Sequence, residues 1–353
     1  MRKIFWMLFV ALLTASCSSD SVEGNTEYLT EKMISVVVAE TGQMFFWDNG
    51  NGTVSVTYDR RNPMHTNINS GKSNDYYKGV VTIPSSITVD DKTMQVTAIT
   101  EYAFMNCTGL TKVVVPASVK SIGEMAFYGC TALEMVEVQG DLTEIPDYCF
   151  YGDKALKSFT ALGQVTRIGV SAFARCTNLT SLKVPEGVKT IDTNCFQSSG
   201  VTYVVLPEGL TQLKPLAFST ATKLKEIGIP ATVTALADSV FYGCSALLTA
   251  YLPETLQTIG TGTFAGCRSI MEMTIPATVT NIGAKCFYSE DANGESNSKS
   301  LILNVMATEP PTLAGSITNA TDYSRIVVPK GCRKPYLAAS YWNEFTQIME
   351  RNY

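Results

Sequence analysis

Histidine is almost absent from this chain, which has only His65 among its 353 residues. Ser-His-Asp and Cys-His catalytic arrangements need a histidine as base. His65 lies between Pro63 and Asn67 in a polar stretch, which predicts a solvated loop rather than a catalytic position. The chain also has no Cys-x-x-Cys pair, the short spacing typical of zinc sites. We therefore expect no enzyme active site, no metal site and no cofactor.

Charged residues are sparse as well. Lys, Arg, Asp and Glu make up 17% of the chain, the net charge is −5 at pH 7, and Lys and Arg form no cluster. Binding to nucleic acid depends on clustered cations that neutralise phosphates, so we expect no nucleic-acid partner. No stretch reaches the roughly 18 apolar residues that a membrane-spanning helix needs.

The first residues have the pattern of an export signal. Two basic residues precede a ten-residue apolar stretch, Ile4–Leu13, which is too short to span a bilayer. Small residues then lead into Cys17 and resemble a bacterial lipobox, although Thr14 stands where Leu is commonest. We predict a lipoprotein signal peptide over 1–16, lipid attachment at Cys17 and a flexible tether over 17–30. The alternative is ordinary secretory cleavage that leaves Cys17 unmodified.

A phenylalanine recurs at a nearly constant interval through the middle of the chain. Successive positions are 23 residues apart, with one interval of 22, and the apolar residues around them recur in step. One such unit cannot bury its own apolar side chains, so like units must stack, and this period is typical of a leucine-rich-repeat solenoid. We predict a β-rich solenoid with short helical or irregular convex segments, in which about nine units fill residues 81–305. The repeated residues are Phe104, Phe127, Phe150, Phe173, Phe196, Phe218, Phe241, Phe264 and Phe287.

Each end of such a stack lacks a neighbour and needs a cap. Residues 31–80 alternate like strands, and Asn49-Gly50 between two of them is a hairpin signal, so we expect a β-rich N-terminal cap. Residues 306–353 are expected to close the other end. There, apolar residues at every third position predict a helix from Tyr336 to Met349.

The repeat unit is described by the pattern Leu-x-x-Val-x-Val-Pro-x-x-Val-x-x-Ile-Gly-x-x-Ala-Phe-x-x-Cys, and its clearest copy runs from Val115 to Val136. It resembles the BspA-type leucine-rich repeat of bacterial surface proteins over 81–305. The tail around Val328-Pro329 and the lipobox-like start resemble that family as well. The resemblance implies a cell-surface lipoprotein, of a kind common in Bacteroidetes, that serves adhesion or binding. The family has no shared catalytic motif, so it assigns no site residue.

The cysteines follow the repeat. Five of the ten stand three residues after the repeated phenylalanine, and three stand one residue before it. Cysteine often serves as a small buried hydrophobe, so we predict a ladder of unpaired thiols. The alternative is a set of disulfides between neighbouring units, such as Cys107–Cys130 or Cys244–Cys267, because an exported protein meets oxidising conditions.

Between the repeated residues lie those that a binding face would use. In Val-x-Val strands alternation sends the intervening side chains outward, and nine strands about 4.8 Å apart make a sheet of roughly 40 Å. Tyr203, Val205 and Tyr251 are the largest outward groups, with Met135 and Val114 as further apolar candidates. Tyrosine is favoured at interfaces, so these five residues are the predicted ligand-binding positions.

Taken together, these patterns predict a non-enzymatic lipoprotein of the outer membrane that faces the extracellular side and is anchored by lipid alone. Its ligand would be a macromolecule, either a host or bacterial surface protein or a glycan. The alternative function is carbohydrate binding or nutrient capture, for which exposed aromatic platforms are expected. A periplasmic location also remains open at this point.

Overall fold

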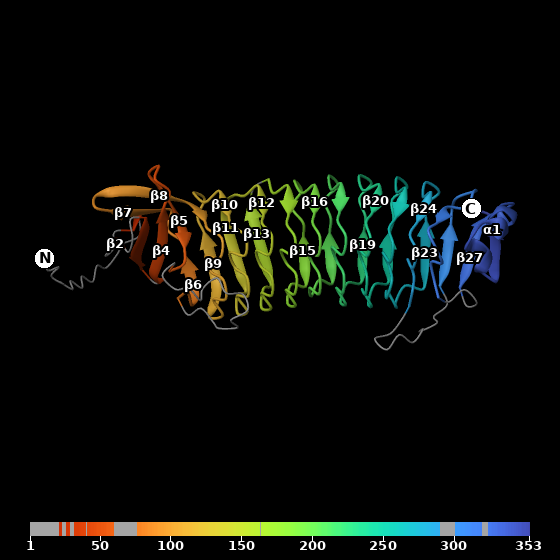
Figure 1. Ribbon diagram of the computed structural model, residues 1–353, viewed down its shortest axis with the longest axis horizontal. Helices are drawn as coiled ribbons and strands as arrows, with labels where there is room; N and C mark the ends of the chain where they lie inside the picture. The colour runs from red at the N-terminus through yellow and green to blue at the C-terminus, as the bar shows by residue number, and fades with distance from the viewer. Residues whose placement is uncertain are drawn as a thin grey trace.

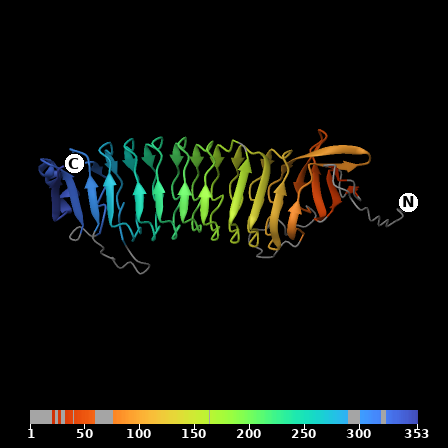
Figure 2. The same cartoon turned by 180° about the vertical axis from the view of Figure 1, so that it is seen from behind.

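The computed structural model describes residues 21–22, 26–28, 32–39, 41–59, 76–162, 164–289, 301–319 and 324–353, and Cys17 and His65 lie outside these ranges. The chain forms an elongated stack of coils (Figures 1 and 2). Short antiparallel strands lie at one end, and the helix α1 (Arg333–Ala338) lies at the other. Equivalent strands recur about every 23 residues, which confirms the predicted repeat solenoid.

Each coil begins with a long strand whose side chains alternate between core and solvent. In β17 (Tyr203–Val205), for example, Val204 is buried and its two neighbours are exposed. We call the side of the stack built by these strands the long-strand face. Its strands are β6 (Gly79–Thr82), β9 (Leu110–Val115), β11 (Met135–Asp141), β13 (Ser158–Leu162), β15 (Ser181–Lys183), β17, β19 (Glu226–Gly228), β21 (Thr249–Tyr251), β23 (Glu272–Ile275), β25 (Ile302–Val305), β27 (Arg325–Pro329) and β28 (Gln347–Arg351).

A two-residue strand follows on a second side, the short-strand face, and buries its second residue, as Ile191 does. In most coils a proline follows the long strand, and since proline lacks an N–H it ends the strand pairing there. The short strands are β10 (Ser121–Ile122), β12 (Glu144–Ile145), β14 (Arg167–Ile168), β16 (Thr190–Ile191), β18 (Gln212–Leu213), β20 (Ala235–Leu236), β22 (Thr258–Ile259), β24 (Asn281–Ile282) and β26 (Thr312–Leu313).

Strands of neighbouring coils pair in parallel, but neither face is one continuous sheet. The long-strand face divides into sheets of four strands, with pairing interrupted between β13 and β15 and between β21 and β23. The short-strand face is interrupted at other coils, between β10 and β12 and between β18 and β20. Within the described residues, no coil boundary is interrupted on both faces.

The third part of each coil is a turn that places the repeated phenylalanine inside the stack. Neighbouring rings are stacked with centroids 5.1–5.7 Å apart and planes within 4–16° of parallel, from Phe104 through Phe287. All nine rings are buried. Offset stacking at this spacing is favourable beyond the burial of area, so the rings form one continuous phenylalanine ladder.

Left-handed residues explain why these turns are irregular rather than helical. Positive φ recurs two residues before and two residues after the phenylalanine, as at Asn194 (57°) and Ser198 (54°) around Phe196. Such residues cannot continue a right-handed helix. Several coils place glycine at the second position, including Gly129 and Gly243, where φ is 72° and 70°.

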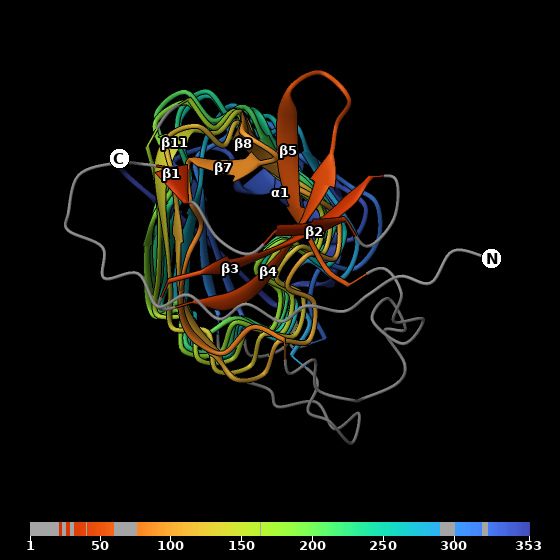
Figure 3. The ribbon, with the colours of Figure 1, turned by 90° about the vertical axis from the view of Figure 1, so that its left-hand side faces the viewer.

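The N-terminal end is closed by antiparallel strands that lie across the stack (Figure 3). The predicted hairpin at Asn49-Gly50 is confirmed, because the two strands on either side of it pair. Two very short strands lie within the segment expected to be a flexible tether and join the same sheet, so those residues are part of the cap. The strands of this sheet are β1 (Ser21–Val22), β2 (Thr26–Tyr28), β3 (Met33–Val38), β4 (Gly42–Asp48), β5 (Thr53–Thr57), β7 (Ser86–Val89) and β8 (Lys92–Ile99), and the short strand β10 pairs with β8.

At the C-terminal end, the prediction of a helix from Tyr336 to Met349 is wrong. The helix α1 ends at Ala338, a short 3-10 turn η1 (Trp342–Glu344) follows, and β28 then pairs in parallel with β27. Tyr341 has φ of 66°, which interrupts a helix, and the free edge of β27 offers backbone partners that a helix would leave unused. Among the described residues, no helix is long and apolar enough to cross a membrane.

The aromatic residues of this segment nevertheless cap the core as expected. Tyr336 and Trp342 are fully buried and stack edge to face with ring centroids 5.2 Å apart. The Tyr336 hydroxyl donates to the carbonyl oxygen of Ala307 at 2.8 Å, and Trp342 Nε1 donates to that of Pro311 at 2.7 Å. The polar ends of both rings are thus satisfied within the cap.

Truncation of the phenylalanine ladder should cost more in the middle than at the end. Phe196 has a ring on both sides, so Phe196→Ala is expected to lower the free energy of unfolding by about 3–5 kcal/mol. Phe287 stacks on Phe264 alone among the described residues and is 7% exposed, so Phe287→Ala should cost clearly less. Urea unfolding of the two variants measures the difference, and equal losses would contradict a stack held together coil by coil.

Candidate ligand-binding face

The parallel register aligns the outward side chains of the long-strand face in two rows across the stack. In one row Ser181, Tyr203, Glu226 and Thr249 follow one another on β15, β17, β19 and β21. In the other row the register aligns Lys183 with Val205, and Gly228 with Tyr251. Each row presents one side chain per coil, about 4.8 Å from the next.

The structure brings three of the five predicted residues together. Tyr203, Val205 and Tyr251 are 52%, 59% and 60% exposed, and β19 alone separates their strands. On β19, Gly228 is paired with Tyr251, and a Cβ added to it would meet no atom within 4 Å. The missing side chain leaves open space on β19 beside Tyr251.

The other two predicted residues lie elsewhere on the face. Met135 is 40% exposed on β11, three long strands before Tyr203. Val114, on β9, is half-buried and is aligned with Glu137, which forms an ion pair with Lys112 at 3.1 Å. Neither residue adjoins the patch of Tyr203, Val205 and Tyr251.

Two further exposed apolar residues on this side of the stack were not suggested by the strand pattern. Leu248 and Met271 are 51% and 53% exposed and stand just before β21 and β23, at equivalent positions of consecutive coils. The signal that could have found them is compositional, since the equivalent residues of the preceding coils are polar or charged. Those residues are Thr111, Glu134, Lys157, Thr180, Thr202 and Lys225.

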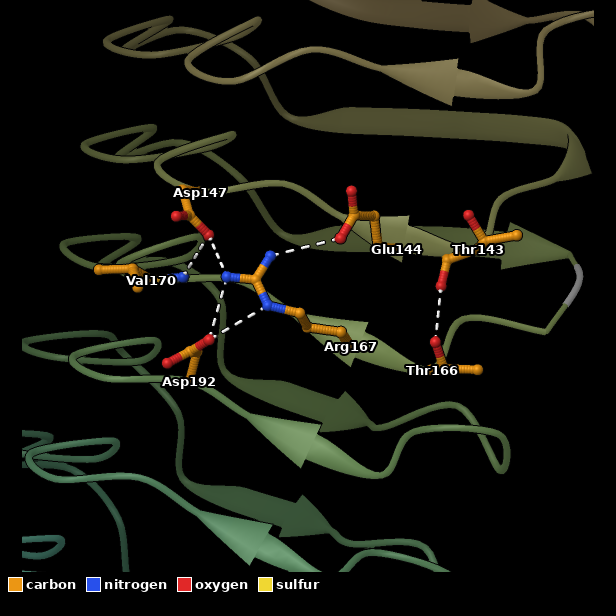
Figure 4. A network of polar contacts seen from close by, with 7 residues as sticks. All are labelled: Thr143, Glu144, Asp147, Thr166, Arg167, Val170 and Asp192. Carbon is orange, nitrogen blue, oxygen red and sulfur yellow. Dashed lines mark hydrogen bonds and ion pairs between the residues drawn. The ribbon is translucent and has the colours of Figure 1, made fainter.

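On the short-strand face, Arg167 forms the most extensive ion-pair network among the described residues (Figure 4). Its guanidinium contacts Asp147 at 2.6 Å and Glu144 at 3.3 Å, both in the preceding coil, and Asp192 at 3.0 Å in the following coil. The Asp147 carboxylate also accepts a hydrogen bond from the Val170 N–H at 2.9 Å. Since each acidic side chain already has the arginine as its partner, the network clamps three coils and offers no free catalytic group.

The cysteines between the coils are unpaired, as predicted, and no disulfide joins any described cysteine. Thiols that follow the phenylalanine donate to the carbonyl oxygen of the phenylalanine one coil earlier, as Cys130 does to Phe104 at 3.0 Å and Cys244 to Phe218 at 3.1 Å. Burial raises the pKa of Cys244 to about 12. These thiols therefore stay neutral, and they serve as core hydrogen-bond donors rather than nucleophiles.

Asp153 replaces the cysteine in one coil and is the outlier of this ladder. It is fully buried, and neither carboxylate oxygen has a hydrogen-bond partner among the described residues. Burial raises the pKa of Asp153 well above its ordinary value. In five other coils the equivalent position holds a neutral thiol, and burial without partners disfavours the charged form of a carboxyl group there. Asp153 therefore belongs to the core as a neutral acid.

No described group of three or more His, Cys, Asp or Glu side chains is placed to hold a metal ion. Asp153 and the thiols around it therefore do not form a metal centre, and the exposed patch on the long-strand face remains the candidate site.

Comparison with known proteins agrees with this architecture. A family described as "BspA type Leucine rich repeat region" matches in six copies over residues 84–202 and 166–293. A leucine-rich repeat protein from Bacteroides ovatus has a similar structure, with a TM-score of 0.67 and 24% identity, covering 92% of this chain and 76% of that one. The leucine-rich repeat protein of T. pallidum gives a TM-score of 0.42 at 25% identity, over 63% and 85% of the two chains. A search of curated proteins gave no match.

The neutral form of Asp153 predicts a pH dependence of stability. The pKa of Asp153 is raised in the folded chain. Above about pH 4 the carboxyl group therefore keeps its proton in the folded chain but loses it in the unfolded chain. The free energy of unfolding consequently falls as the pH rises above that value. Asp153→Asn cannot ionise. Relative to this variant, the wild type should lose about 1.4 kcal/mol per pH unit as the pH rises above about 4, until folded Asp153 ionises. Urea unfolding across this range measures the difference, and parallel profiles would show that Asp153 is charged in the fold.

Proposed function

This chain belongs to the BspA-type leucine-rich repeat proteins, and on that premise we propose that it is a non-enzymatic surface protein that binds a macromolecule through its long-strand face. The observation that carries this proposal is the exposed apolar patch of Tyr203, Val205, Tyr251, Leu248 and Met271, each more than half exposed. Tyr203, Val205 and Tyr251 stand on strands of one sheet, so little further ordering of their backbone is needed on binding.

The composition of the patch suits a protein ligand. Tyrosines supply rigid area with a polar tip, and they often dominate the energy of protein interfaces. Glu226 is exposed between Tyr203 and Thr249 in the same row, so the apolar surface has a carboxylate at its centre that would favour a basic group on the partner.

Carbohydrate capture is the second candidate. Tyr203 and Tyr251 lie on either side of β19 and could each stack on a sugar ring, with Glu226 between them as a hydrogen-bond acceptor. Leu248 and Met271 favour the protein ligand, since sugars present few apolar groups to such side chains.

We further propose that the chain is exported and anchored in the outer membrane by a lipid on Cys17, with the solenoid facing outward. The apolar N-terminal stretch and the small residues before Cys17 support this location. An outward orientation would bring the long-strand face into contact with host or bacterial surface molecules.

The ligand-binding role is tested by arrays of matrix proteins, bacterial surface proteins and glycans probed with the purified chain. Tyr203→Ser combined with Tyr251→Ser should lower affinity for a protein ligand about tenfold or more. Tyr242→Ser is the matched control, because Tyr242 is 48% exposed but lies on the phenylalanine turn of its coil. Equal losses in both variants would contradict the assigned face. Binding only to glycans would favour carbohydrate capture.

The anchor is tested by Cys17→Ala in the producing bacterium. The variant should incorporate no labelled palmitate and should leave the membrane fraction, whereas Cys332→Ala should keep both properties. Label retained by Cys17→Ala would contradict lipidation at this residue. Protease treatment of intact cells should digest the wild-type chain, and a chain left untouched would place it in the periplasm.

A further inference from the structure

Gly228 lies within the exposed patch at a position where the fold gives no reason for a glycine. It is the third residue of β19, and the third residues of β15, β17 and β21 are Lys183, Val205 and Tyr251. Its φ lies outside the left-handed region that favours glycine, and an added Cβ would meet no atom within 4 Å. The backbone would therefore accept a side chain at this position as it does in the neighbouring coils.

A glycine here also costs stability. Glycine loses more conformational freedom on folding than any other residue, and in a strand it has no side chain to pack against its neighbours. A glycine inside a strand commonly marks a place where a ligand or another backbone approaches closely. The open space beside Tyr251 is therefore space that a partner can occupy down to the backbone of β19.

Glu226 supplies a charge next to this open space. It is exposed two residues before Gly228 and on the same side of β19, because alternate residues of a strand point to the same side. The register places Tyr203 beside Glu226 and Tyr251 beside Gly228, so an aromatic ring stands on either side of β19. Although Lys225 precedes Glu226 in the chain, no described cation forms an ion pair with this carboxylate.

We propose that this place on β19 binds a basic side chain, arginine or lysine, of a protein partner. The inference deepens the proposed function, on which it rests, by naming the group that the patch recognises. In the complex the Glu226 carboxylate pairs with the cation, and the faces of Tyr203 and Tyr251 attract it from either side. The apolar stem of the bound side chain lies over Gly228, where any larger residue would obstruct it.

Other occupants fit this place less well. An acidic group is repelled by Glu226, and an apolar side chain would cover the carboxylate without pairing with it. Arginine fits better than lysine, because its planar guanidinium can stack on an aromatic ring and bond to a carboxylate at the same time. An amino sugar carries its ammonium group directly on the ring, so it has no stem that could lie over Gly228.

The charge is tested with beads that carry ten-residue peptides of Ser, Thr and Val, identical except at one central position, which is Arg, Lys, Gln or Glu. The Arg and Lys beads should retain the wild-type chain at least fivefold better than the Gln beads, and the Glu beads should retain it least. Glu226→Gln should reduce this preference to less than twofold. Glu124→Gln is the matched control and should keep the preference, because Glu124 is equally an exposed carboxylate but lies on the turn before Phe127.

The open space is tested separately by Gly228→Thr. Threonine is favoured in strands, so this variant should unfold at a higher temperature than the wild type, and the same unfolding curve shows that it is folded. It should nevertheless lose most of the preference for the Arg beads, because its side chain occupies the space of the bound stem. A lower unfolding temperature, or an undiminished preference, would show that the glycine does not serve a ligand.

Equal retention by the Arg and Gln beads, including retention by neither, would overturn the proposal, as would a preference that Glu226→Gln leaves unchanged. Chitosan oligomers that bind through Glu226 more tightly than the Arg peptide would assign the place to an amino sugar instead.

The proposed function and this inference can fail separately. A macromolecular ligand that depends on Tyr203 and Tyr251 but on neither Glu226 nor Gly228 would support the binding face and contradict the cation site. An Arg preference that depends on Glu226, together with no ligand on the arrays, would support the cation site and leave the proposed function contradicted.

Discussion

Every coil of this molecule buries its apolar side chains only against the next coil, and the phenylalanine ladder is the clearest expression of that constraint. Rings 5.1–5.7 Å apart fix both the separation and the orientation of neighbouring coils. The strand pairing, the thiol hydrogen bonds and the Arg167 clamp all join residues of adjacent coils at the same period. A residue that departs from the repeat pattern in one coil therefore changes mainly the packing of the two adjacent coils.

Much of this architecture could be predicted because it repeats. The spacing of the phenylalanines indicates the solenoid, and alternation along each long strand correctly sends Tyr203, Val205 and Tyr251 to the surface. Each of these inferences rests on a short-range period that local sterics enforce. The unpaired thiols followed in the same way, since serine and alanine can replace them without a partner.

The remaining features depend on contacts between segments that no period connects. Gly228 leaves open space beside Tyr251 only because the register pairs the two residues. Phe159 looks like an ordinary apolar residue until its packing against both Phe150 and Phe173 is known. In the C-terminal cap, helical spacing was outweighed by the free edge of β27, which bound the last strand. Tertiary context decided all three.

The staggered interruptions of the two faces have a mechanical consequence. Along the stack, strand pairing is interrupted first on the short-strand face and then on the long-strand face, and this order is repeated once. The interruptions of the two faces therefore alternate. At each coil boundary where strand pairing is interrupted on one face, the strands of the other face are hydrogen-bonded. A pulling force along the axis is therefore resisted by backbone hydrogen bonds at each of these boundaries. Such a solenoid can bend or open locally where pairing is interrupted on one face, while the paired strands of the other face hold the two coils together.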